Sequence, residues 1–103
     1  MPSKDYRIWL DAQTYLVVEF VMMRGRIVSF VVRLMLLDQA GTESNVARYD
    51  TAHGAPHLDA LGKQSGLLRK TWYIDASADA VLRWAIDDFK SHHEDYIRNY
   101  LQN

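Results

Sequence analysis

The chain has 103 residues, of which 49% are hydrophobic and 24% charged, and its formal net charge at pH 7 is −1. This length suits a single domain, residues 1–103, with one modest core. The small net charge excludes a protein-wide basic field of the kind that drives non-specific nucleic-acid binding. Because there is no cysteine, disulfides, thiol nucleophiles and thiolate metal ligands are excluded as well.

The first residues already carry charge, at Lys4 and Asp5. This differs from the charged, apolar and small-residue layout of a secretory signal, so we expect a cytoplasmic protein. The apolar stretch 15–37 is interrupted by charges such as Glu19, Arg26 and Arg33, and no uncharged window of about 18 residues remains to span a bilayer. We therefore expect a pair of strands there and no membrane contact.

Alternating apolar and polar residues predict about five strands before the last quarter of the chain. The predicted strands cover residues 6–11, 14–23, 27–37, 45–50 and 68–74. In the second and third strands the even-numbered residues are mainly apolar, so one face of the sheet should form the core. A three-residue loop, Arg24 to Arg26, would set Phe20 opposite Phe30, with Gly25 free to take a positive φ.

The fourth predicted strand, 45–50, is expected to turn Ala47 and Tyr49 toward the core. The face away from the core is then polar, and cross-strand or diagonal contacts should form on it. The residues expected on this outer side are Glu19, Arg33, Val46, Arg48 and Asp50.

Helical periodicity replaces the strand pattern after Ile74 and predicts a helix over 77–101. Asp75 or Ser77 can cap its N-terminus, and Asp79 adds negative charge to the first turn. One stripe of the helix is apolar and should cover the even-numbered face of the sheet; it contains Ala78, Leu82, Ala85, Ile86, Phe89, Tyr96, Ile97 and Tyr100. The predicted fold is an α+β two-layer sandwich, with a mainly antiparallel sheet and one long C-terminal helix.

The segment RYDTAHGAPHLD, residues 48–59, concentrates groups suited to chemistry. His53 and His57 are candidates for a general acid and a general base, since imidazole exchanges protons near neutral pH. Arg48 could bind a phosphate through its planar guanidinium. Asp50 could orient a histidine or Arg48.

Two other interpretations of this segment stay open. It could be a polar surface loop packed by its own side chains. Alternatively, His53, His57 and Asp59 could bind a divalent metal, although Gly54 and Pro56 disfavour the helix on which such ligands usually lie. No motif for an organic cofactor is present, and we expect no cofactor.

A third group of residues suggests contacts with partners. Trp84 projects opposite the apolar stripe of the helix, and together with Glu19 and Arg33 it is a candidate for an interface in a homo-oligomer. Glu19 and Arg33 can equally be a simple surface ion pair. The alternating cations and aromatics in 69–73 could contact single-stranded nucleic acid, although an amphipathic strand beside a core explains them equally well. His93 lies on the apolar stripe of the predicted helix, where we expect a buried structural histidine. His92 lies at the edge of that stripe.

The elements RYD and HGAPHLD, followed by GLLRKTWY and AIDDF, resemble a family of small uncharacterised bacterial proteins with RYD and HGxPHxD elements. More distantly, the RYD strand end before a histidine loop is similar to TumE-type toxins of toxin–antitoxin systems. That resemblance implies a ribonuclease with RNA and a cognate antitoxin as partners. It also implies functional roles for Arg48, Tyr49, Asp50, His53 and His57, and we expect Asp59 to join Arg48 and Tyr49 in contacting the substrate.

Overall fold

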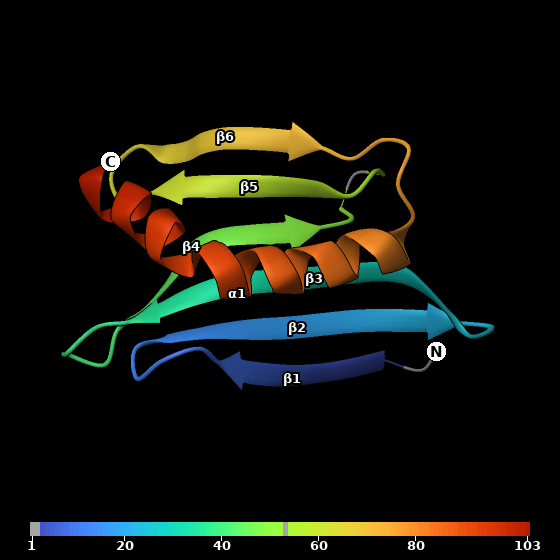
Figure 1. Cartoon of the computed structure of the whole chain (residues 1–103), viewed down its shortest axis with the longest axis horizontal. Coiled ribbons are helices and arrows are strands. Elements are labelled where there is room, and N and C mark those ends of the chain that lie inside the picture. The colour runs from blue at the N-terminus through green and yellow to red at the C-terminus, as the bar shows by residue number, and fades with distance from the viewer. Residues whose placement is uncertain (1–2, 53) are drawn as a thin grey trace.

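The computed structural model describes residues 3–52 and 54–103 (Figure 1). Six strands precede one helix: β1 (Ser3–Trp9), β2 (Thr14–Met23), β3 (Arg26–Leu37), β4 (Glu43–Asp50), β5 (His57–Gly62), β6 (Gly66–Trp72) and α1 (Ala78–Gln102). The strands form one sheet in the order β1-β2-β3-β4-β5-β6, and each pairs antiparallel with its neighbour in the chain. In this described part no helix is both long and apolar enough to cross a membrane.

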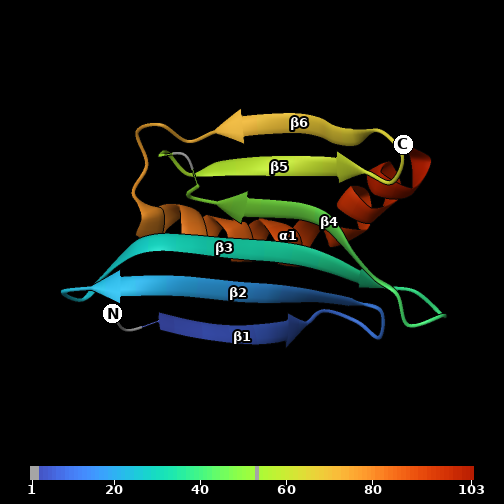
Figure 2. The ribbon, with the colours of Figure 1, turned by 180° about the vertical axis from the view of Figure 1, so that it is seen from behind.

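The helix lies across one face of the sheet, over β2 to β5 (Figure 1). Seen from behind, the opposite face of the sheet has no helix on it (Figure 2). We call this second face the outer face. The α+β two-layer class predicted from the sequence is therefore confirmed, but the sheet has six strands rather than five.

The strand missing from the prediction is β5, which lies between the predicted strands 45–50 and 68–74, where a loop was expected. Its outward residues His57 and Asp59 alternate with Leu58 and Ala60, but this alternation is only four residues long and directly follows the turn-forming residues Gly54 and Pro56. Its inward residue Leu58 is buried in the core. The other strands differ from the prediction only at their ends. The largest difference is in β1, which begins at Ser3, three residues earlier than predicted.

The register predicted for β2 and β3 is confirmed, since Phe20 lies opposite Phe30. The predicted loop length is wrong. The loop has two residues, Arg24 and Gly25, both with positive φ, 53° and 78°, a combination that suits the twist of a tight hairpin. A register shift beyond Val21 then leaves Val28 without a partner, and this extra residue restores the even-numbered core face.

The core forms between the sheet and α1, as the apolar stripe predicted. Ser77 caps the helix, accepting a hydrogen bond from the amide of Ala80 through its side chain, and Asp79 lies in the first turn. The buried core residues are Leu16, Val18, Phe30, Val32, Leu34, Val46, Ala47, Tyr49, Leu58, Val81, Leu82, Ala85 and Phe89. Val81, at the edge of the predicted apolar stripe, is also buried in the core, although the prediction did not include it.

Val46 corrects the outer-face prediction. The β3–β4 register shifts so that Leu34 pairs with Ala47 and Met35 with Asn45, leaving Val46 as the extra residue of a bulge. Val46 is buried and belongs to the core cluster. Arg48 and Asp50 remain on the outer face as predicted, because they follow the bulge.

Candidate functional site on the outer face of β4 to β6

Three adjacent strands bring a set of charged side chains together on the outer face. Arg48 of β4 lies opposite Asp59 of β5, which lies opposite Lys70 of β6. Two residues away along each strand, and on the same face, Asp50 lies opposite His57 and His57 opposite Trp72. We call Arg48, Asp50, His57, Asp59 and Lys70 the charged cluster.

His57 is at the centre of the cluster and is only 2% exposed. Its Nδ1 lies 3.2 Å from the carbonyl oxygen of Ala55, and since a carbonyl only accepts, Nδ1 carries the proton. The other ring nitrogen, Nε2, lies 3.2 Å from Asp50 Oδ1 and 3.7 Å from Asp59 Oδ2. The two carboxylates thus converge on one imidazole nitrogen.

The two carboxylates also contact the neighbouring cations. Arg48 donates from Nε and Nη2 to Asp59 Oδ2, at 3.3 and 3.2 Å, and its Nε lies 3.4 Å from Asp50 Oδ2. Asp50 Oδ1 accepts from the amide of Ala52 at 2.9 Å. Lys70 Nζ lies 3.3 Å from Asp59 Oδ1, yet no group in the described residues makes a well-formed hydrogen bond to that buried oxygen.

The cations and an aromatic ring form the surface of the cluster. The side chains of Arg48 and Lys70 are 42% and 32% exposed, against 9% and 3% for Asp50 and Asp59. Trp72 is 43% exposed, its ring covers His57 with centroids 4.7 Å apart, and Lys70 Nζ lies 5.3 Å from its centroid. The acids and the imidazole are therefore buried, while Arg48, Lys70 and Trp72 face the solvent.

The loop between β4 and β5 is tied down at both ends. The Thr51 hydroxyl accepts from the amide of Phe30 at 3.1 Å, and the carbonyl of Pro56 accepts from the amide of Tyr73 at 2.9 Å. Between these anchors Gly54 has a φ of 110°, a conformation that favours glycine. His53, one of the two predicted acid–base residues, lies outside the described residues.

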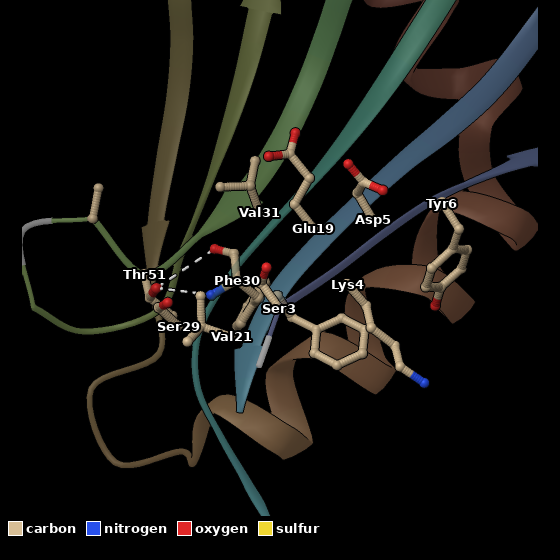
Figure 3. A pocket seen from close by; sticks show the side chains of 12 residues that line it. Ser3, Lys4, Asp5, Tyr6, Glu19, Val21, Ser29, Phe30, Val31 and Thr51 are labelled. Carbon is tan, nitrogen blue, oxygen red and sulfur yellow. Dashed lines mark hydrogen bonds between the residues drawn. The ribbon is translucent and has the colours of Figure 1, made fainter. Parts of the chain in front are cut away.

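A broad hollow of about 850 Å³ lies beside the start of this loop (Figure 3). Figure 3 shows Thr51 bonded to Phe30 at one end and the carboxylates of Asp5 and Glu19 at the other. Val31, which also lines the hollow, pairs with Asp50, so the hollow adjoins the charged cluster. Its charged lining residues are Lys4, Asp5 and Glu19, so carboxylates are in excess there, whereas the exposed charged side chains of the cluster are the cations Arg48 and Lys70.

The structure separates Tyr49 from the other predicted site residues. Tyr49 faces the helix, is 1% exposed, and donates from its hydroxyl to Asp88 Oδ2 at 2.7 Å. Burial, together with that hydrogen bond, raises the pKa of Tyr49 well above its usual range. A ligand on the outer face would meet Arg48, Lys70 and Trp72 rather than Tyr49.

The three predicted interface residues lie on two sides of the molecule. Glu19 and Arg33 form the expected diagonal ion pair on the outer face, whereas Trp84 lies on the helix, 54% exposed. A single flat interface therefore does not include all three. His93 has a side chain only 15% exposed and lies 3.4 Å from Asp11, in keeping with its expected structural role, while the more exposed His92 contacts Asp88.

Sequence reasoning did not select Lys70 and Trp72 as site residues. The sequence feature that could have identified them is the group of cations and aromatics in 69–73. In β6, Lys70 and Trp72 lie on one face of the strand and Arg69 on the other. The missing information was β5, since without that strand nothing connects Lys70 to Asp59.

A six-stranded antiparallel meander with a helix on one face and a charged cluster on the other defines a two-layer α+β domain. The chain belongs to the family described as Domain of unknown function (DUF7718), whose model matches residues 1–103. This agrees with the resemblance to an uncharacterised family of this length. No curated protein and no solved structure matches the chain.

Proposed function

We propose that the protein is a small cytoplasmic ribonuclease of the toxin–antitoxin or phage-defence kind, with a cognate antitoxin as its protein partner. RNA would bind over the outer face of β4 to β6. The observation that carries this proposal is the pair of solvent-facing cations, Arg48 and Lys70, beside the exposed ring of Trp72.

Arg48 and Lys70 suit the phosphate groups of a nucleic acid. The guanidinium offers a planar set of donors and the ammonium a point charge. Asp50 and Asp59 hold both cations by ion pairs from below, so their side chains are already ordered before a ligand arrives. Such preorganisation lowers the entropic cost of binding.

Trp72 supplies the contact for a base. Its side chain is 43% exposed, and Lys70 lies beside the ring. Stacking of a base on an aromatic side chain contributes about 1–3 kcal/mol. This contact requires an unpaired base, so a single-stranded RNA is the substrate that fits.

A binding experiment tests this assignment with a matched pair of variants. Lys70→Ala and Arg69→Ala remove one positive charge each from neighbouring positions on opposite faces of β6. With a fluorescent single-stranded RNA, we expect Lys70→Ala to weaken binding and lower its salt dependence. Trp72→Ala should weaken binding about 5- to 150-fold, the equivalent of about 1–3 kcal/mol. Equal effects of Lys70→Ala and Arg69→Ala would argue against the outer face.

Cleavage is tested separately, through the histidines. The sequence predicts His53 and His57 as acid and base, with Asp50 orienting the site. We expect His53→Ala and His57→Ala each to slow cleavage of a labelled RNA about 100-fold or more, whereas His92→Ala, on the exposed side of the helix, should not slow it. Unchanged cleavage in both loop variants would exclude the histidine loop as the site of chemistry.

A further inference from the structure

We propose that Asp50, His57 and Asp59 bind a divalent first-row metal ion, with zinc as the best-fitting ion. This ligand set differs from the one suggested by the sequence, because Asp50 takes the place that His53 had there. One ligand atom of each residue lies within 4.8 Å of the others. The three side chains come from the end of β4 and the start of β5, where the register sets Asp50 against His57.

The spacing of the ligand atoms fits a bound metal ion. A tetrahedral zinc ion bound at about 2.0–2.2 Å holds its ligand atoms about 3.3–3.6 Å apart. Nε2 of His57 lies 3.2 Å from the oxygen of Asp50 and 3.7 Å from that of Asp59. Both distances are close to the separation that a tetrahedral zinc ion imposes on its ligand atoms.

The tautomer of His57 is the one that a metal requires. Its Nδ1 proton is directed to the carbonyl of Ala55, so Nε2 is the ring nitrogen left to face Asp50 and Asp59. Metal-binding histidines commonly donate their other ring N–H to a backbone carbonyl or carboxylate, which fixes the ring in this way. A proton on Nε2 or a bound cation must separate this nitrogen from the two carboxylates, since a lone pair would repel them.

Asp59 gives an independent indication of a ligand. Its side chain is 3% exposed, and among the described residues no hydrogen bond of good geometry reaches its Oδ1. Buried carboxylate oxygens without a hydrogen bond are unusual in folded proteins. Lys70 Nζ lies 3.3 Å from this oxygen without a well-formed hydrogen bond, so the carboxylate can still accept a metal ion.

Arg48 and Lys70 influence how tightly the site binds a metal ion. They already balance the charge of the two aspartates, so a divalent ion adds net positive charge and should bind more weakly than in structural zinc sites. We expect a Kd on the order of 1–10 µM. Three protein ligands leave a position open for water or a phosphate oxygen, as in catalytic zinc sites.

The test is a titration of chelator-treated full-length protein, free of affinity tags, with zinc ions in the absence of RNA. Isothermal calorimetry should show one ion per chain, and Asp50→Asn and Asp59→Asn should weaken binding at least about 100-fold, beyond the 10- to 100-fold typical of outer-shell partners. The matched control is His92→Ala, which disrupts the exposed His92–Asp88 pair and should leave the zinc affinity unchanged.

A second measurement uses the wild-type chain and does not depend on variants that fold. Manganese ions should broaden the amide NMR signals of Asp50, His57 and Asp59 before those of α1. Absence of one-to-one zinc binding, unchanged affinity in the asparagine variants, or broadening centred on the helix would overturn the metal site. Because no RNA is present, this outcome is independent of the proposed function. Only a role of the metal in cleavage rests on that function, and in the metal-bound chain His57 would be a ligand and not the acid or base.

Discussion

Asp88 connects the helix to the sheet through one carboxylate oxygen. Its Oδ2 accepts hydrogen bonds from Tyr49 of β4 at 2.7 Å and from Tyr96 of α1 at 2.6 Å. Both phenol rings also contact Phe89. A single side chain therefore satisfies two hydroxyl groups that burial has removed from water.

Replacing Asp88 with alanine should destabilise the fold by about 2–4 kcal/mol, because two buried hydroxyl groups lose a charged acceptor. Urea denaturation followed by circular dichroism measures this loss. The control is Asp87→Ala, at the exposed neighbouring position, which should change stability by less than about 0.5 kcal/mol. Equal effects of the two variants would show that the carboxylate bridge contributes nothing.

The same bridge predicts a response to alkaline pH. Burial raises the pKa of Tyr49, and that of Tyr96, well above the usual range, so the folded chain keeps protons that the unfolded chain loses above pH about 10. Stability should then be constant below about pH 9 and fall above pH 10, by up to about 1.4 kcal/mol per pH unit for each tyrosine. In Tyr49→Phe the fall should be shallower; an equal slope in urea denaturation at pH 9–11 would contradict this account.

Among the elements, the end of α1 is bound to the turn between β5 and β6. The main-chain oxygen of Asn103 accepts from the amides of Gln64 and Ser65 at 3.1 and 2.7 Å. The amide of Lys63 donates to the carbonyl of Tyr100 at 2.9 Å. This contact requires a residue without a side chain at Gly62, since a Cβ there would lie 2.9 Å from the Asn103 oxygen.

Gly62→Ala should release this end of the helix without unfolding the sheet. We expect a loss of about 1 kcal/mol, the usual contribution of one or two hydrogen bonds, and faster hydrogen exchange at the Ser65 amide. Lys63→Ala removes only an exposed side chain from the same turn and should leave that exchange rate unchanged. Retention of slow exchange in Gly62→Ala would show that the helix end can shift and still bind the turn.

The local sequence pattern was sufficient to predict the strands and the helix that have one apolar face. The alternation in 14–37 predicted β2, β3 and the Phe20–Phe30 register, and the helical period predicted α1 with its Ser77 cap. It failed at β5, where the alternation of His57 and Asp59 with Leu58 and Ala60 is only four residues long and follows Gly54 and Pro56. His57 and Asp59 are buried among charged partners on neighbouring strands, and such pairing is not visible in a local pattern.

The sequence also predicted one part of the candidate site and missed another. Arg48, Asp50, His57 and Asp59 are close in the sequence and their chemistry identified them. Lys70 and Trp72 join them only through the β5–β6 register. Tyr49 was grouped with Arg48 because it is its neighbour in the chain, although successive residues of a strand point to opposite faces.

At the scale of the whole molecule, stability depends on one layer of contacts between α1 and the sheet. Phe89 is fully buried there, and Phe89→Ala should cost about 3–5 kcal/mol, a large part of the 5–15 kcal/mol typical of such domains. Trp84→Ala, on the other side of the same helix, should cost less than about 0.5 kcal/mol. Chemical denaturation of the two variants measures both; a large loss for Trp84→Ala would indicate a partner on the exposed side.

The up-and-down order of the strands has a consequence for how the chain acquires its shape during synthesis. Every strand pairs with the one made just before it, so hairpins can form one after another through short loops with a small entropic cost of closure. The helix follows all six strands in the chain. The apolar side of the growing sheet therefore stays uncovered until translation of α1, and this is the interval in which a nascent chain is most exposed to aggregation or capture by chaperones.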